Sequence, residues 1–375
     1  MIDIGFAFNF NIQRCEIEVG DEQQITDRGY KPLLQLFKKY NMKANCFISG
    51  YTSQCIKKID PDFLKTIKSQ IGKSIMLGTY TYTHPIPQLL NNEEFSRQMA
   101  VGLKIDRELL GVDTVGFLPP EFAYTATMGK VLVERGIRWF LALASQIEIG
   151  LKNAGVKADP YVPYSVVVKG KRLIVVPAAY QLPETPARFL KLMMKGQLPV
   201  DTVIEGVKAF AKEHPEGLLL FKRDGETIFI DDFNSGFHGT FEVLEEFLSK
   251  LCKLDFARTA WIEDVIEKKA SRTEIELPDY LGNTKIETFT EGAAEEIWNL
   301  TKKVRDKLLV AEKEGLSKDK LERAWEYLLL SHNSDGRIGY WFSKWNPGEH
   351  KVAPSRRQFI VDNLNKAWEI LNKNI

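Results

Sequence analysis

The sequence has few cysteines and no long apolar run. The four cysteines are scattered and form no Cys-x-x-Cys pair (Cys15, Cys46, Cys55 and Cys252), so neither a zinc site nor a disulfide framework is predicted. No apolar run approaches the length that spans a bilayer. Residues 1–6 lack the basic and apolar segments of a signal peptide. We therefore expect reduced thiols and a cytoplasmic location.

The sequence also has almost no net charge. Its 375 residues include 51 basic and 50 acidic side chains, which leaves a formal charge of +1. This balance lacks the electrostatic footprint of a nucleic-acid-binding protein, so we expect no nucleic acid and no membrane as a partner. The 44% hydrophobic content fits a globular protein with a large core, organised as one large and one smaller domain or as two ordinary domains.

Several motifs of common enzyme classes are missing. Gly72-Lys73-Ser74 resembles the end of a phosphate-binding loop, but Ile67 stands where that loop needs a glycine. No G-x-G-x-x-G, G-x-S-x-G or H-E-x-x-H run occurs. The five histidines include no close pair (His84, His214, His238, His332 and His350). No cofactor or single-segment metal site is predicted.

Short apolar runs alternate with helical patterns up to about residue 265. The candidate strands are Ile2–Phe10, Ala44–Ser49, Ser74–Thr83, Thr114–Leu118, Arg138–Ala144, Leu173–Val176, Leu218–Phe221 and Thr227–Ile230. Their continuous apolar character is typical of strands buried on both faces of a parallel sheet. Between them, Asp201 is a candidate cap for an amphipathic helix. About seven β/α units favour a (β/α) barrel, complete or incomplete, over an open doubly wound sheet.

The pattern becomes wholly helical after an irregular stretch. Three apolar faces predict a small C-terminal helical bundle: Ile297, Leu300, Val304, Leu308 and Ala311; Leu321, Ala324, Trp325, Leu328 and Leu329; and Leu364, Ala367, Trp368 and Leu371. The predicted organisation is a barrel over residues 1–268, a linker over 269–290 and a helical domain over 291–375 that completes the cleft.

Three segments place polar residues just after a predicted strand, where barrel enzymes carry their sites. In the first, Pro85 biases His84 toward an extended conformation, although a structural loop explains the segment equally well. In the second, two prolines and several aromatics surround Glu121, including Tyr124. The alternative for Glu121 is the N-terminus of a surface helix, where the helix dipole favours glutamate.

The third segment contains two adjacent aspartates, Asp231 and Asp232, followed by His238. Adjacent side chains on a strand point to opposite faces, so only one aspartate can share a site with Glu121. The alternative is a turn followed by a helix cap, because Asp, Asn, Ser and Gly are common turn residues.

In order and spacing, these segments resemble glycoside hydrolase family 57, whose members are chiefly α-glucan-active amylases, branching enzymes and 4-α-glucanotransferases. The resemblance also covers Gly136-Ile-Arg-Trp-Phe140 and the stretch from Leu328 to Trp341, which is similar to the family's segment that reaches back into the cleft. It implies an incomplete (β/α)7 barrel with a helical domain, in agreement with the strand pattern. It also implies a retaining enzyme that needs no metal or cofactor.

By position, the resemblance implies that Glu121 is the nucleophile and Asp232 the general acid/base, with Asp231 as the fallback. It implies that His84 contacts sugar, while Trp341 or Trp345 could stack on a pyranose ring. Further candidates come from the first strand, from the polar segments and from the stretch after Leu328. The predicted substrate-binding residues are Asn9, Asn11, His84, Tyr124, His238, Asp335, Trp341 and Trp345.

Two departures from the family pattern bear on activity. The first strand of the family ends in His-x-His, whereas this chain has Asn9 and Asn11, which form hydrogen bonds but shuttle no protons. The family's aspartate is followed by Gly-Glu, whereas Phe233 and Asn234 follow Asp232. An impaired homologue that binds carbohydrate without cleaving it is therefore an alternative. A metal-dependent polysaccharide deacetylase, which has a related barrel, is a third hypothesis.

Overall fold

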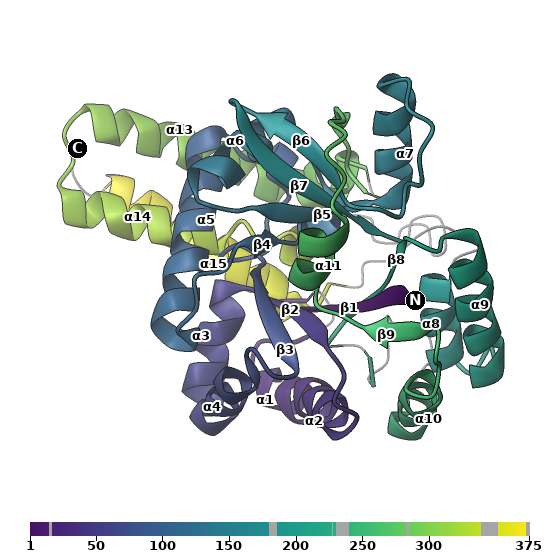
Figure 1. Ribbon diagram of the computed structural model, residues 1–375. Helices are drawn as coiled ribbons and strands as arrows, with labels where there is room; N and C mark the ends of the chain where they lie inside the picture. Colours follow the sequence, from purple (N-terminus) through teal and green to yellow (C-terminus); the bar gives the residue numbers. More distant parts are fainter. Residues whose placement is uncertain are drawn as a thin grey trace.

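The computed structural model describes residues 1–14, 17–179, 186–226, 228–229, 240–282, 285–338 and 352–372. A parallel sheet forms its centre (Figure 1). Its seven mutually parallel strands are β1 (Ile2–Phe10), β2 (Ala44–Ile48), β3 (Ile75–Thr79), β4 (Gly116–Phe117), β5 (Trp139–Leu143), β7 (Lys171–Ala178) and β8 (Leu218–Asp224). Two short additions complete the sheet: β6 (Tyr164–Val168), antiparallel to β7, and β9 (Ala257–Thr259), parallel to β1.

The strands follow the order β7-β5-β4-β3-β2-β1-β8 across the sheet. The two end strands, β7 and β8, contact each other, but no hydrogen-bonded ladder joins them within the described residues. The barrel is therefore incomplete, and the predicted (β/α)7 architecture is confirmed. Because all seven strands run the same way, their carboxyl ends meet on one face, which is where such barrels carry their sites.

The strand predictions were wrong mainly at the ends of strands. β3 ends at Thr79 rather than Thr83, because Thr81 already has a left-handed φ of 65°. β8 continues past Phe221 to Asp224, and the described residues of the predicted strand at 227–230, Ile228 and Phe229, form a bend instead. The prediction also missed the short strands β6 and β9.

Helices cover the outside of the sheet. They are α1 (Glu22–Ile25), α2 (Lys31–Lys39), α3 (Gly50–Ile59), α4 (Pro61–Gln70), α5 (Asn92–Ile105), α6 (Ala126–Glu134), α7 (Ala144–Asn153), α8 (Pro186–Met194), α9 (Val200–Glu213), α10 (Phe241–Leu251) and α11 (Ile262–Lys269). Two π-helical turns continue α1 and α5: η1 (Thr26–Tyr30) and η3 (Asp106–Leu110). The predicted cap Asp201 was wrong, because the N-cap of α9 is Pro199 and Asp201 lies in the first turn.

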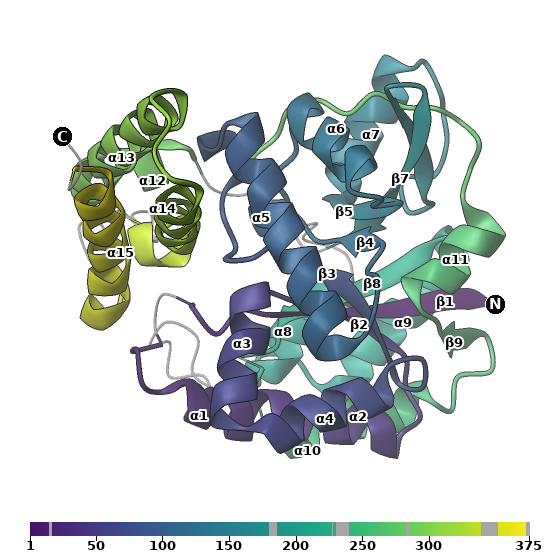
Figure 2. The ribbon, with the colours of Figure 1, turned by 90° about the vertical axis from the view of Figure 1, so that its left-hand side faces the viewer.

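The C-terminal region contains α12 (Glu287–Thr290), α13 (Glu295–Lys313), α14 (Lys318–Leu330) and α15 (Pro354–Asn372). Figure 2 shows these helices grouped on one side of the barrel, beyond α3 and α5. The bundle's apolar core includes Tyr82 and Ile105 of the barrel, so the two parts share buried surface. The predicted faces are largely buried, except that Trp368 is 37% exposed. The domain limits themselves remain a prediction.

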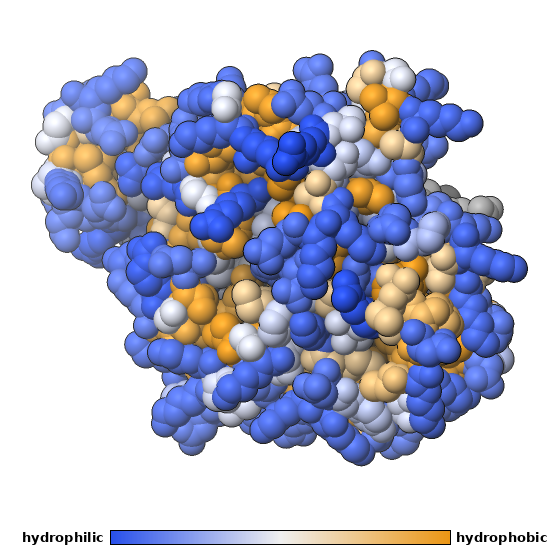
Figure 3. Space-filling view, in the orientation of Figure 1, coloured by the Kyte–Doolittle hydropathy of each residue, from blue (hydrophilic) through white to orange (hydrophobic). Residues whose placement is uncertain are grey.

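The surface seen in Figure 3 is mainly hydrophilic, with apolar side chains in small separate groups. Among the described residues, no helix is both long enough and apolar enough to cross a membrane.

Candidate functional site

His84 lies in the loop that follows β3, and its backbone is left-handed with a φ of 59°. The expected extended conformation was therefore wrong. Two hydrogen bonds override the local bias from Pro85: the His84 amide donates to Thr81 Oγ1 (3.2 Å), and its carbonyl accepts from the Ser334 amide (3.1 Å). The second bond comes from the segment between α14 and α15.

The imidazole of His84 has polar partners at Nδ1. Nδ1 lies 3.0 Å from Ser334 Oγ and 3.1 Å from Asp335 Oδ2, and the ring packs against Tyr80 with centroids 4.5 Å apart. The side chain is buried, and Nε2 has no hydrogen-bond partner among the described residues. A buried ring nitrogen without a partner is costly unless a ligand or water satisfies it. His84 is therefore oriented to offer Nε2 to a ligand.

The end of β1 contributes the two asparagines. Asn11 Nδ2 donates to Asp335 Oδ2 (2.6 Å), so Asn11 and His84 hold the same carboxylate oxygen. Asn9 is buried, and its Oδ1 has no hydrogen-bond partner among the described residues. The first strand and the segment after α14 are therefore joined directly at this site.

Glu121 follows β4 in a short 3-10 turn, η4 (Pro120–Phe122), with a left-handed φ of 54°. The alternative interpretation of Glu121, as the first turn of a surface helix, was wrong. Glu121 is half-buried, and both it and Phe122 have left-handed backbones, which an α-helix does not allow. Non-glycine residues held in this region often mark functional sites.

The pKa of Glu121 shows which groups surround its carboxylate. Burial raises the pKa above the ordinary value, and the charges of Asp335 and Asp224 raise it further. The charges of His84 and Lys222 lower it. Glu121 is thus electrostatically coupled to residues that follow β3, to residues at the end of β8 and to the segment after α14. A carboxylate in this setting is suited to act as a nucleophile or a proton carrier.

Sequence reasoning missed the charged group at the end of β8. Asp224 Oδ1 accepts from Lys222 Nζ (2.7 Å), and Asp224 Oδ2 accepts from Arg14 Nη1 (2.8 Å). Burial raises the pKa of Asp224, but Lys222 and Arg14 lower it by more, well below its ordinary value. The sequence does contain a motif that could have identified this group. Asp224-Gly225-Glu226 is the Asp-Gly-Glu run expected of the family, and it lies earlier in the chain than the predicted aspartates.

Glu226 is buried beneath the end of β1. Its Oε2 accepts from the Asn11 amide (3.3 Å) and from the hydroxyl of Tyr30 (3.3 Å), whose ring stacks on Phe10. Burial and the charge of Asp224 raise the pKa of Glu226 to about 8. This pKa favours the neutral form of Glu226 at pH 7, whereas the pKa of Asp224 favours its carboxylate. Arg14 Nη1, which pairs with Asp224, also lies 3.9 Å from Glu226 Oε1.

We expect Glu226→Gln to change the pH dependence of stability. The folded-state pKa of about 8 lies above the unfolded value, so wild-type stability should fall as pH rises from about 5 through 8. Glutamine mimics the neutral acid and cannot ionise. Thermal unfolding at closely spaced pH values should show a smaller decline for Glu226→Gln, with similar melting temperatures at pH 5. Parallel curves for the two proteins would contradict this assignment.

The described part of the chain brings none of the other predicted site residues into this cluster. Tyr124 stacks on Phe140 (centroids 5.3 Å apart) within a hydrophobic core cluster, and burial raises the pKa of its hydroxyl to about 12. Asp231, Asp232, His238, Trp341 and Trp345 lie outside the described residues. Within the described part of the chain, no three His, Cys, Asp or Glu residues are grouped so that they could hold a metal ion.

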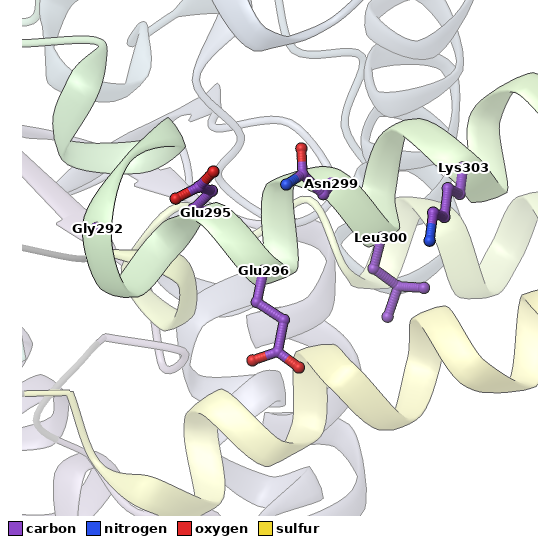
Figure 4. A pocket seen from close by; sticks show the side chains of 6 residues that line it. All are labelled: Gly292, Glu295, Glu296, Asn299, Leu300 and Lys303. Atoms are coloured by element: carbon purple, nitrogen blue, oxygen red, sulfur yellow. The ribbon is translucent and has the colours of Figure 1, made fainter.

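A separate pocket of about 540 Å³ lies on α13 (Figure 4). Its lining residues are Gly292, Glu295, Glu296, Asn299, Leu300 and Lys303, and the polar ones are exposed. Figure 4 shows Glu296 extending toward the neighbouring helix α15. The pocket contains none of the predicted site residues and no buried polar group, so the cluster around Glu121 is the better candidate for chemistry.

The chain matches one known protein family and several solved structures. The profile of glycosyl hydrolase family 57 matches residues 14–278. The fold is similar to a 4-α-glucanotransferase from Thermococcus litoralis, at 18% identity and a TM-score of 0.74, over 98% of this chain and 60% of that one. It is also similar to a family 57 branching enzyme from Thermococcus kodakaraensis, at 15% identity and a TM-score of 0.72, over 98% and 90% of the two chains.

A third similar structure is the α-amylase AmyC from Thermotoga maritima, at 10% identity and a TM-score of 0.69, over 99% of this chain and 93% of that chain. A search of curated proteins found no match. The chain thus spans 60% of the length of the glucanotransferase but at least 90% of the other two enzymes. At these identities, the structural likeness establishes the fold.

Proposed function

Because the chain belongs to glycosyl hydrolase family 57, we propose that it is a retaining glycoside hydrolase or transglycosylase acting on an α-linked glucan or a related oligosaccharide. The observation that carries the proposal is the cluster of buried and half-buried carboxylates around Glu121, at the strand ends where barrel enzymes work. The similar structures described as a glucanotransferase, a branching enzyme and an α-amylase support the substrate class.

In the proposed reaction, Glu121 attacks the anomeric carbon and forms a covalent glycosyl-enzyme. In the general retaining mechanism, a second carboxyl group assists the leaving group, and water or an acceptor hydroxyl then releases the sugar with retained configuration. His84 Nε2 and Asn9 Oδ1, buried and without partners among the described residues, would bind sugar hydroxyls. Asp335 would hold His84 and Asn11 in register.

We propose Asp224 as the second carboxylate. It is electrostatically coupled to Glu121 and belongs to the Asp-Gly-Glu run at the end of β8. Asp232, with Asp231 as the fallback, remains the assignment that the family resemblance implies, and both lie outside the described residues. The two proposals make opposite predictions for the variants Asp224→Asn and Asp232→Asn.

The test is a product screen on α-glucan oligosaccharides and on glycosides with activated leaving groups. We expect turnover by the wild type on at least one activated substrate, no turnover by Glu121→Gln, and a covalent glycosyl adduct on Glu121 after trapping with a 2-fluoro sugar. A larger loss for Asp224→Asn than for Asp232→Asn would support Asp224. Equal turnover by wild type and Glu121→Gln would reject the proposal.

The second candidate function is a catalytically impaired homologue that binds carbohydrate. It is favoured by the ion pairs of Lys222 and Arg14 with Asp224, because an acid/base residue must carry a proton during the reaction. Saturable oligosaccharide binding that is unchanged in Glu121→Gln, with no product from any substrate, would favour this function over catalysis.

A further inference from the structure

Both carboxylate oxygens of Asp224 are occupied by cations. Lys222 Nζ lies 2.7 Å from Oδ1, and Arg14 Nη1 lies 2.8 Å from Oδ2. The side chains of all three residues are at most 11% exposed, so water screens these contacts little. Lys222 stands two residues before Asp224 on β8, so both side chains leave the same face of the strand. Arg14 comes from the segment after β1.

This arrangement conflicts with the usual role of a second carboxylate. A general acid must present a protonated oxygen to the leaving group, but two buried cations favour the ionised form and occupy both oxygens. Among the described residues, Arg223 and Glu226 also lie near this carboxylate. Arg223 lowers the pKa of Asp224, and a pKa of about 8 favours the neutral form of Glu226 at pH 7.

Lys222 also acts on the proposed nucleophile. Its ammonium lies 5.8 Å from the ring centroid of Phe122, the residue after Glu121, and its charge lowers the pKa of Glu121. The same cation therefore favours an ionised nucleophile while holding Asp224 ionised. The arrangement suits the attack step but not protonation of a leaving oxygen.

We propose that Lys222 and Arg14 are positioning residues that hold Asp224 as a carboxylate, so that the site cleaves glycosides whose leaving group departs as an anion. This inference rests on the proposed function. In the step, a Glu121 oxygen forms a bond to the anomeric carbon, and the bond to the leaving group breaks. The leaving group takes the electron pair, and no proton is transferred.

A glycosyl fluoride with and without azide is the probe, because fluoride leaves without protonation and azide attacks without a general base. We expect the wild type to release fluoride from α-glucosyl or α-maltosyl fluoride and, with azide, to form the α-glycosyl azide. Turnover of maltooligosaccharides should be slower by about 100-fold or more, since general acid catalysis contributes 10²–10⁴-fold.

Three variants separate the positioning role from a structural one. Lys222→Met replaces the ammonium with an apolar chain of similar size and should raise maltooligosaccharide turnover on the order of tenfold. In the assay with azide, this variant should form more of the hydrolysis product and less of the glycosyl azide than the wild type. Arg14→Met removes the other ion pair and should act in the same direction. Lys222→Arg keeps the cation and should keep the preference for the fluoride over maltooligosaccharides, as a rescue by the conservative variant.

The outcomes distinguish this inference from the proposed function. Comparable wild-type rates on the fluoride and on maltooligosaccharides, with no azide product, would overturn the inference and leave the proposed function intact. A fall in maltooligosaccharide turnover in folded Lys222→Met and Arg14→Met would overturn it too. Absence of fluoride release and of glycosyl azide above the Glu121→Gln background, in wild type and variants alike, would reject the proposed function itself.

Discussion

Replacing Glu94 with glutamine is expected to lower the free energy of unfolding by about 3–5 kcal/mol, the usual cost of breaking a buried ion pair. Glu94 is fully buried in the first turn of α5, and its Oε1 accepts from Arg305 Nε of α13 at 2.7 Å. Arg305 also donates to the carbonyl of Leu89 (2.8 Å). The pair therefore joins the barrel to the helical bundle, and glutamine would leave a mostly buried guanidinium without its counter-charge.

The same pair predicts how stability depends on pH. Burial raises the pKa of Glu94, but the nearby His332 ring and Arg305 lower it by more, to about 2. Burial lowers the pKa of His332, which favours its neutral form, and Arg305 Nε donates directly to the Glu94 carboxylate. Because the folded pKa is depressed, the stabilisation is complete above about pH 5 and is lost as pH falls from the unfolded value of about 4.5 toward 2.

Urea unfolding at pH 7 and pH 3 measures both effects. The matched control is Glu93→Gln, one residue earlier, whose carboxylate is 52% exposed and pairs with Arg97 on the same helix. An exposed pair of this kind contributes about 0.5 kcal/mol or less. The difference between the two variants should shrink at pH 3. Equal stability of Glu94→Gln and Glu93→Gln at pH 7 would contradict the assignment of a joining role.

This ion pair shows the limit of what the sequence could predict. Arg305 and Glu94 stand 211 residues apart, and nothing in either local pattern indicates the other. In contrast, the barrel was predictable because strands buried on both faces read as continuous apolar runs. The helical bundle was predictable for a related reason, since its apolar faces recur at helical spacing.

The candidate site was predicted in part, for physical reasons that differ between residues. Glu121 was found because prolines and aromatics mark its turn in the sequence itself. Asp224 was missed because the strand was predicted to end at Phe221, which left Asp224 inside a presumed connection rather than at the end of β8. The backbone of His84 was mispredicted because its conformation depends on Ser334, a contact across 250 residues.

Gly282→Ala is expected to lower turnover of a glycosyl fluoride on the order of 100-fold, because a displacement of about 1 Å in a catalytic group can cost that much. A Cβ on Gly282 would lie 1.8 Å from the carbonyl oxygen of Glu121, far inside van der Waals contact. The two segments are tied next to this point, where the amides of Tyr124 and Tyr280 donate to each other's carbonyls at 2.8 and 3.0 Å. Relieving the clash therefore moves Glu121 rather than separating the segments.

The matched control for this variant is Gly136→Ala. Gly136 has a φ of +82°, so alanine there carries left-handed strain, but an added Cβ meets no atom within 4 Å. Measured kcat should fall for Gly282→Ala alone, while both variants should retain cooperative unfolding. Loss of kcat to the same degree in both variants would indicate general destabilisation. An unchanged kcat in folded Gly282→Ala would show that the position of Glu121 does not limit turnover. Because the contact involves only the backbone of Glu121, a selective loss would link the segment before the helical bundle to the position of the nucleophile.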